Sequence, residues 1–107
     1  MNNMKTLTDN NFAEVIESNE LPVIVDFAAE WCAPCRKLTP ILEELSVELK
    51  EKAVIAKFNI EENPKTPSQF AIRSIPTILI FKNGKKIDEK VGSLPKEKLL
   101  DWILETI

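Results

Sequence analysis

Histidine is absent from this chain of 107 residues, and cysteine and glycine occur only twice each. The lack of histidine removes the usual general base, Cys-His catalysis and most kinds of zinc site. Because zinc needs about four ligands, the two cysteines could supply only half of a site shared between molecules. Two cysteines are also too few for the disulfide framework of a small secreted fold, which uses more of them at wider spacing.

Strong charge and long apolar runs are lacking as well. The formal net charge of −3 argues against non-specific nucleic-acid binding, which requires a basic face. No apolar run approaches the length of a membrane span, and residues 1–6 lead into no signal-type apolar region. With 44% hydrophobic and 29% charged residues, the composition is that of an ordinary globular protein. We therefore expect a single domain over residues 1–107, located in the cytoplasm and contacting neither nucleic acid nor membrane.

Both cysteines lie in the segment Glu30-Trp31-Cys32-Ala33-Pro34-Cys35-Arg36, where a strongly apolar stretch gives way to a helical pattern. At such a strand-to-helix junction, Cys32 lies at the helix N-terminus and Cys35 about one turn further along. Unsatisfied N–H groups at a helix N-terminus favour the thiolate of Cys32 over its thiol. Two thiols one turn apart can close or reopen a small disulfide ring, so the pair predicts a redox couple. A pair of reduced, inert core cysteines is the alternative.

The strands are indicated by short apolar runs rich in β-branched residues. Continuous runs predict strands buried on both faces at 21–27, 53–60 and 77–81. The segment Lys82-Asn83-Gly84-Lys85 predicts a hairpin that leads into an antiparallel strand at 86–91. Residues 4–7 are a candidate edge strand.

The helices are indicated by apolar residues that recur at helical spacing. They predict helices at about 9–17, 34–50 and 95–107, the last with Trp102 in the core. Residues 61–67 are expected to form a loop and 68–72 a short helix. The order βαβαββα predicts an α/β fold with a central mixed sheet and helices on both faces, a three-layer α/β/α sandwich.

Asp26 places an ionisable group inside the buried strand predicted at 21–27. Desolvation should raise the pKa of its carboxyl group. Lys57 lies on the neighbouring predicted strand, where it could pair with Asp26 and oppose that rise. A purely structural buried ion pair is the alternative to a role in the chemistry.

From about Thr8 to the C-terminus the chain resembles the thioredoxin family. The resemblance is carried, in chain order, by Val25-Asp26-Phe27, Trp31-Cys32, Pro34-Cys35-Arg36, Pro40, Lys57-Phe58-Asn59, Ile72-Arg73-Ser74-Ile75-Pro76-Thr77, Phe81-Lys82-Asn83-Gly84 and Val91-Gly92. Several ordered motifs at family spacing are far more specific than the cysteine pair alone. The resemblance implies the thioredoxin fold and a thiol–disulfide oxidoreductase that reduces protein disulfides.

The resemblance also implies roles for the residues of this redox pair. Cys32 would be the more exposed nucleophile, Cys35 the resolving thiol, and Cys32–Cys35 the disulfide of the oxidised form. Asp26 would accept the proton of the Cys35 thiol through water, and Lys57 would modulate Asp26. The dipeptide between the cysteines, Ala33 and Pro34, tunes the redox potential in this fold.

A substrate-binding rim is implied as well. Ile75-Pro76 resembles the family's cis-proline loop, which would turn the Ile75 backbone toward the sulfurs and let it bind a substrate chain as a short added strand. A trans turn proline is the alternative. The mostly apolar rim would comprise Trp31, Ala33, Pro34, Ile60, Ile75, Pro76, Val91 and Gly92. For Trp31 and Ile60, ordinary core packing is the alternative.

Two positions depart from the family pattern. Ala33 stands where the family usually has glycine, and Ala28 where many members have an aromatic residue.

We expect a monomer without bound cofactor, recycled by an NADPH-dependent thioredoxin reductase and acting on disulfide-bearing proteins. A more oxidising disulfide exchanger or isomerase, and a non-catalytic protein-binding subunit on the same fold, are the alternatives.

Overall fold

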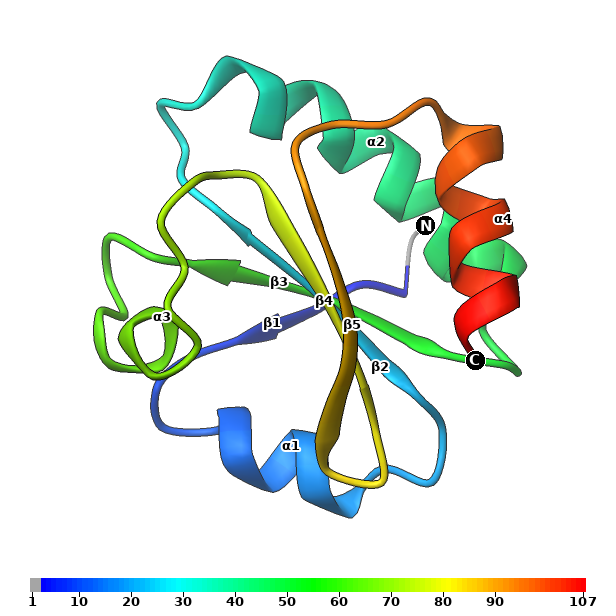
Figure 1. The fold of residues 1–107 in the computed structure, drawn as a ribbon, viewed down its shortest axis with the longest axis horizontal. Helices are drawn as coiled ribbons and strands as arrows, with labels where there is room; N and C mark the ends of the chain where they lie inside the picture. Colours follow the sequence, from blue (N-terminus) through cyan, green and yellow to red (C-terminus); the bar gives the residue numbers. More distant parts are fainter. Residues whose placement is uncertain (1–2) are drawn as a thin grey trace.

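The computed structural model describes residues 3–107, which form a five-stranded mixed sheet with helices on both faces (Figure 1). The strands, in spatial order, are β1 (Lys5–Leu7), β3 (Val54–Asn59), β2 (Val23–Ala28), β4 (Thr77–Lys82) and β5 (Lys85–Val91). The three strands β1, β3 and β2 run parallel, whereas β4 runs antiparallel to both β2 and β5. The mixed sheet predicted from the sequence is therefore confirmed, with the apolar strand β2 at its centre.

Two separate apolar cores lie on the two faces of this sheet. The helices α2 (Ala33–Glu48) and α4 (Lys96–Thr106) cover one face, where their leucines and Trp102 pack on isoleucines of β2, β3 and β4. The helix α1 (Phe12–Ser18) covers the other face and packs Phe12 and Ile16 on Phe27 and Phe58. The short helix α3 (Lys65–Gln69) lies near α1 in Figure 1. This arrangement is the predicted three-layer α/β/α sandwich.

The prediction of a short helix at 68–72, after a loop at 61–67, is wrong. The helix α3 begins at Lys65 and ends at Gln69, and Ala71 follows with a φ of 53°. The carboxylate of Asp9 accepts hydrogen bonds from the backbone N–H groups of Lys65 and Thr66, at 3.1 and 2.8 Å, and thereby caps the start of α3. The prediction that the first helix begins near residue 9 is also wrong, because Thr8 and Asn11 close a turn and α1 begins only at Phe12.

The hairpin between β4 and β5 forms where the sequence predicts it. Asn83 and Gly84 have φ values of 54° and 79°, the positive pair that a two-residue hairpin loop of type I′ requires. Trp102 is buried as predicted and donates a hydrogen bond of 2.8 Å from its indole nitrogen to Asp88 Oδ2 on β5. Among residues 3–107, no helix is both long enough and apolar enough to cross a membrane.

Candidate active site

The two cysteines lie at the junction of β2 and α2 and form a disulfide. Cys32 is the N-cap residue of α2, and its sulfur accepts a hydrogen bond of 3.3 Å from the backbone N–H of Cys35. Their Cα atoms are 5.2 Å apart. The relative exposures are 5% for Cys32 and 2% for Cys35, so both are buried in the oxidised form. This N–H, at the N-terminus of α2, favours the Cys32 thiolate once the disulfide is reduced.

The loop before β4 covers the disulfide from the side. The peptide bond between Ile75 and Pro76 is cis, as the resemblance implied, and the carbonyl oxygen of Ile75 lies 4.0 Å from Cys32 Sγ. Within the described part of the chain, the N–H of Ile75 donates no hydrogen bond. Ile60 and Ile75 pack against the cluster formed by Ala29 and the two cysteines. An N–H that has no partner in residues 3–107, next to a carbonyl that contacts the Cys32 sulfur only weakly, forms a backbone edge to which an extended peptide can bind.

The remaining residues of the predicted rim surround this loop. Gly92 donates a backbone hydrogen bond of 2.8 Å to the carbonyl of Pro76, and Val91 pairs with Thr77 across the sheet. Trp31 is 65% exposed, so ordinary core packing does not explain it. Ala33 and Pro34 are exposed in the first turn of α2. The structure thus brings together all the residues expected at the rim, and their contacts with substrate remain a prediction.

Asp26 lies in the middle of β2, the strand that leads into the cysteine segment, and is 2% exposed. Burial raises the pKa of its carboxyl group to about 7, because desolvation disfavours the charged form. Its Oδ1 atom has no hydrogen-bond partner in residues 3–107. Lys57 is the register partner of Asp26 on β3, as predicted, but no ion pair joins them in the described chain. The Lys57 side chain is instead exposed to solvent, which removes the opposing effect expected from the sequence.

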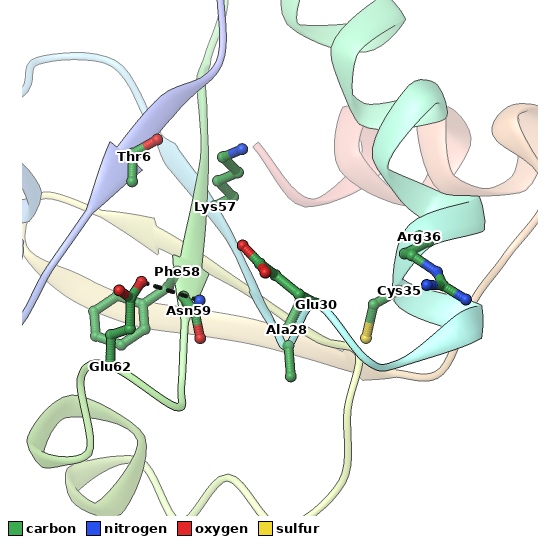
Figure 2. A pocket seen from close by; sticks show the side chains of 10 residues that line it. Thr6, Ala28, Glu30, Cys35, Arg36, Lys57, Phe58, Asn59 and Glu62 are labelled. Carbon is green, nitrogen blue, oxygen red and sulfur yellow. Dashed lines mark hydrogen bonds between the residues drawn. The ribbon is translucent and has the colours of Figure 1, made fainter.

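A cleft of about 280 Å³ opens between the ends of β1, β2 and β3 and the start of α2 (Figure 2). It is lined by Thr6, Ala28, Ala29, Glu30, Cys35, Arg36, Lys57, Phe58, Asn59 and Glu62. The cleft reaches Cys35 on a side of α2 that the predicted rim does not include. Sequence reasoning missed Thr6, Asn59 and Glu62 as neighbours of the site, because only the strand order brings these segments to the cysteines.

Sequence reasoning also passed over the hydroxyl of Thr77. This residue is buried at the first position of β4, and its Oγ1 donates a close hydrogen bond to the carbonyl of Ser74. A hydroxyl residue directly after a proline, at the start of an apolar strand, is the signal that could have found it.

Comparison with known proteins agrees with this geometry. The family model described as Thioredoxin matches residues 3–105. The chain belongs to the thioredoxin family. A thioredoxin of Rickettsia prowazekii is 52% identical over 104 residues, which cover 97% of this chain and 99% of that protein. A thioredoxin of Rhodospirillum rubrum is 49% identical over 94% of this chain and 96% of its own length, and one of Haemophilus influenzae is 40% identical over the full length of both.

Membership of the thioredoxin family and the disulfide between Cys32 and Cys35 together define the chemistry of the chain. It is a thiol–disulfide oxidoreductase of the protein-disulfide reductase type, in which the cysteine pair carries two electrons. The fold and the family that the sequence resemblance implied are confirmed.

Proposed function

We propose that this thioredoxin-family chain reduces disulfides in extended segments of other proteins and is then recycled by an NADPH-dependent thioredoxin reductase. The observation that carries the proposal is the position of the disulfide, at the start of α2 and beside Ile75, whose N–H has no partner in residues 3–107. A substrate strand that pairs with Ile75 would bring its own disulfide to Cys32. The exposed ring of Trp31 adds apolar contact area at the same edge.

The reaction proceeds in two exchanges. The Cys32 thiolate attacks one sulfur of the substrate disulfide, which forms a mixed disulfide and releases the other substrate sulfur as a thiolate. The Cys35 thiolate then attacks Cys32, which closes the disulfide between Cys32 and Cys35 and releases the second substrate sulfur. Two electrons pass to the substrate, and the reductase returns them to the cysteine pair.

Asp26 is the proposed proton acceptor for Cys35. A carboxyl group with a pKa of about 7 exists in both protonation states near neutral pH, which suits it to take up a proton and give it back. Because Asp26 Oδ1 lacks a protein partner in residues 3–107, its carboxylate has an acceptor position free for a water that links it to the thiol. Lys57 occupies the neighbouring register position and lines the cleft, so it would modulate this carboxyl only by turning its ammonium from solvent toward Asp26.

The setting of the reaction follows from the same proposal. We propose that residues 1–107 act as one domain and as a monomer in the cytoplasm, where a reductant can keep the cysteines reduced. The cysteine pair carries the electrons itself, so the chain needs no bound cofactor, and NADPH enters only through the reductase.

Reduction of a protein disulfide, with thioredoxin reductase and NADPH as electron source, tests the proposal. The wild type should consume NADPH in proportion to the substrate disulfide reduced. Cys35→Ser should stop turnover and accumulate a mixed disulfide at Cys32, whereas Cys32→Ser should form no such adduct with the protein substrate. If the wild type had a reducible cysteine pair but gave no turnover, the fold would serve as a protein-binding subunit.

The alternative of a more oxidising exchanger rests on Ala33, which is exposed between the two cysteines. Equilibrium with a glutathione or dithiothreitol buffer measures the potential of the pair. A value near the −270 mV typical of thioredoxins, to within about 20 mV, supports a reductant. A value of about −180 mV, the potential of protein disulfide isomerase, would instead indicate an exchanger.

A further inference from the structure

We propose that Thr77 is a positioning residue that sets the affinity for protein substrates by holding the loop that presents Ile75. This inference rests on the proposed function, because it concerns how the same site recognises its substrate. In residues 3–107 the Thr77 hydroxyl bonds to Ser74 and to neither cysteine, so it would act through the backbone of residues 74–76.

Within residues 3–107, the hydroxyl of Thr77 donates to a single partner. The side chain is 2% exposed at the start of a strand that continues Ile-Leu-Ile-Phe. Its Oγ1 donates to the carbonyl oxygen of Ser74, three residues earlier. For packing alone, a valine would supply nearly the same volume. The hydroxyl therefore serves the Ser74 carbonyl, which would otherwise lose its hydrogen bond at the base of the loop.

A second hydrogen bond fixes the other side of Ile75. The N–H of Gly92 donates to the carbonyl of Pro76 at 2.8 Å. The carbonyls of residues 74 and 76 are thus both tied to the sheet, one through β4 and one through the end of β5. Between them, Ile75 keeps its N–H unbonded within residues 3–107, and its carbonyl lies 4.0 Å from Cys32 Sγ. The two anchors lie on either side of the residue that a substrate strand would bind.

Because the loop is already held in place, less conformational entropy is lost when substrate binds. Without the Thr77 hydroxyl, residues 74–75 would sample more conformations, and ordering them would oppose docking of a protein segment. One hydrogen bond of this kind corresponds to about a five- to tenfold change in affinity. A small aromatic disulfide that reacts at Cys32 without pairing to a backbone edge would be unaffected.

The experiment compares Thr77→Val with Thr77→Ser on two substrates, a disulfide-bonded protein and a small aromatic disulfide. We expect Thr77→Val to raise the KM for the protein about five- to tenfold. The kcat, and the rate with the small disulfide, should stay within about twofold of wild type. Thr77→Ser keeps the hydroxyl and should restore the KM. The matched control is Thr106→Val, which removes a hydroxyl that donates at 2.7 Å to the carbonyl of Trp102 in α4.

Several results would overturn the inference. An unchanged KM for Thr77→Val, an equal loss on both substrates, or a failure of Thr77→Ser to rescue would each contradict a positioning role. Urea unfolding of every variant shows whether it is folded, and Thr77→Ala provides a second test of the hydroxyl if the valine variant does not fold. Failure of the proposed function would look different, because the wild type itself would then reduce neither substrate.

Discussion

The buried carboxyl of Asp26 makes the stability of the oxidised protein depend on pH in a direction that can be calculated. In the unfolded chain an aspartate releases its proton near pH 3.8, whereas in the native state the pKa of Asp26 is about 7. Between about pH 4 and pH 7 the native state therefore keeps a proton that the unfolded chain has lost. Stability is greatest below this window and falls as the pH rises through it.

The magnitude follows from the difference between the two pKa values. At about 1.4 kcal/mol per pKa unit, the rise from 3.8 to about 7 corresponds to about 4 kcal/mol of lost stability above the window. Asp26→Ala removes this cost and leaves a small cavity worth about 1 kcal/mol. We expect the variant to be more stable than wild type by about 3 kcal/mol at pH 8.5 and less stable by about 1 kcal/mol at pH 4.

Urea unfolding of the oxidised wild type and Asp26→Ala, measured between pH 4 and pH 8.5, provides the assay. The control is Asp101→Ala, which removes an exposed carboxylate from α4 and should shift stability by a nearly constant amount. A stability difference between wild type and Asp26→Ala that stays constant across this range would refute the reasoning. The reduced form of the same variant tests the chemical role, because unchanged reduction kinetics from pH 6 to pH 9 would exclude Asp26 as proton acceptor.

Three further predictions concern the other regions of the fold. Phe12 contacts the rings of Phe27, Phe58, Phe70 and Phe81, so Phe12→Ala should lower the free energy of unfolding by about 3 to 5 kcal/mol in a urea titration. Desolvation acts to raise the pKa of Asp9, but its hydrogen bonds from the start of α3 outweigh this and leave the pKa lowered. The ionised Asp9 therefore stabilises the folded state above the pKa of the unfolded chain, and this stabilisation is lost on acidification. The loss of unfolding free energy caused by Asp9→Ala should shrink as the pH falls toward 2. A loss that is independent of pH would contradict this. Trp31→Ala should raise the KM for a protein disulfide several-fold and leave the urea midpoint unchanged, because the ring is exposed; a loss of stability would place Trp31 in the core instead.

The parts of the fold that the sequence predicted correctly depend on local patterns. Continuous apolar runs identify β2, β3 and β4, because a strand buried on both faces has no solvent-exposed side that would carry polar residues. The Asn83-Gly84 pair identifies the hairpin, since few other residues adopt positive φ at both positions. The cis bond before Pro76 was accessible only through the family resemblance, because nothing in the residues alone separates it from a trans turn.

The errors arise where residues distant in the sequence determine a local structure. The start of α3 is set by Asp9, 56 positions before Lys65, and no local signal near residue 65 reveals it. Lys57 was expected to pair with Asp26 because the two occupy adjacent register positions. A register position does not fix the direction of a long, flexible side chain, and the lysine amine remains in solvent rather than entering a desolvated site. The cleft beside Cys35 depends on strand order and could not be predicted from any single segment.

The central position of β2 also determines when the cysteines become shielded during synthesis. Both of its neighbours in the sheet, β3 and β4, follow it in the chain, and β4 comes later than α2 and β3. A chain synthesised from its N-terminus therefore contains Cys32 and Cys35 before the loop that carries Ile75 has been added. Pairing of β4 with β2 gives the central strand its second neighbour and also brings the Ile75 carbonyl to Cys32. The step that encloses β2 between two strands is thus also the step that covers the reactive sulfur.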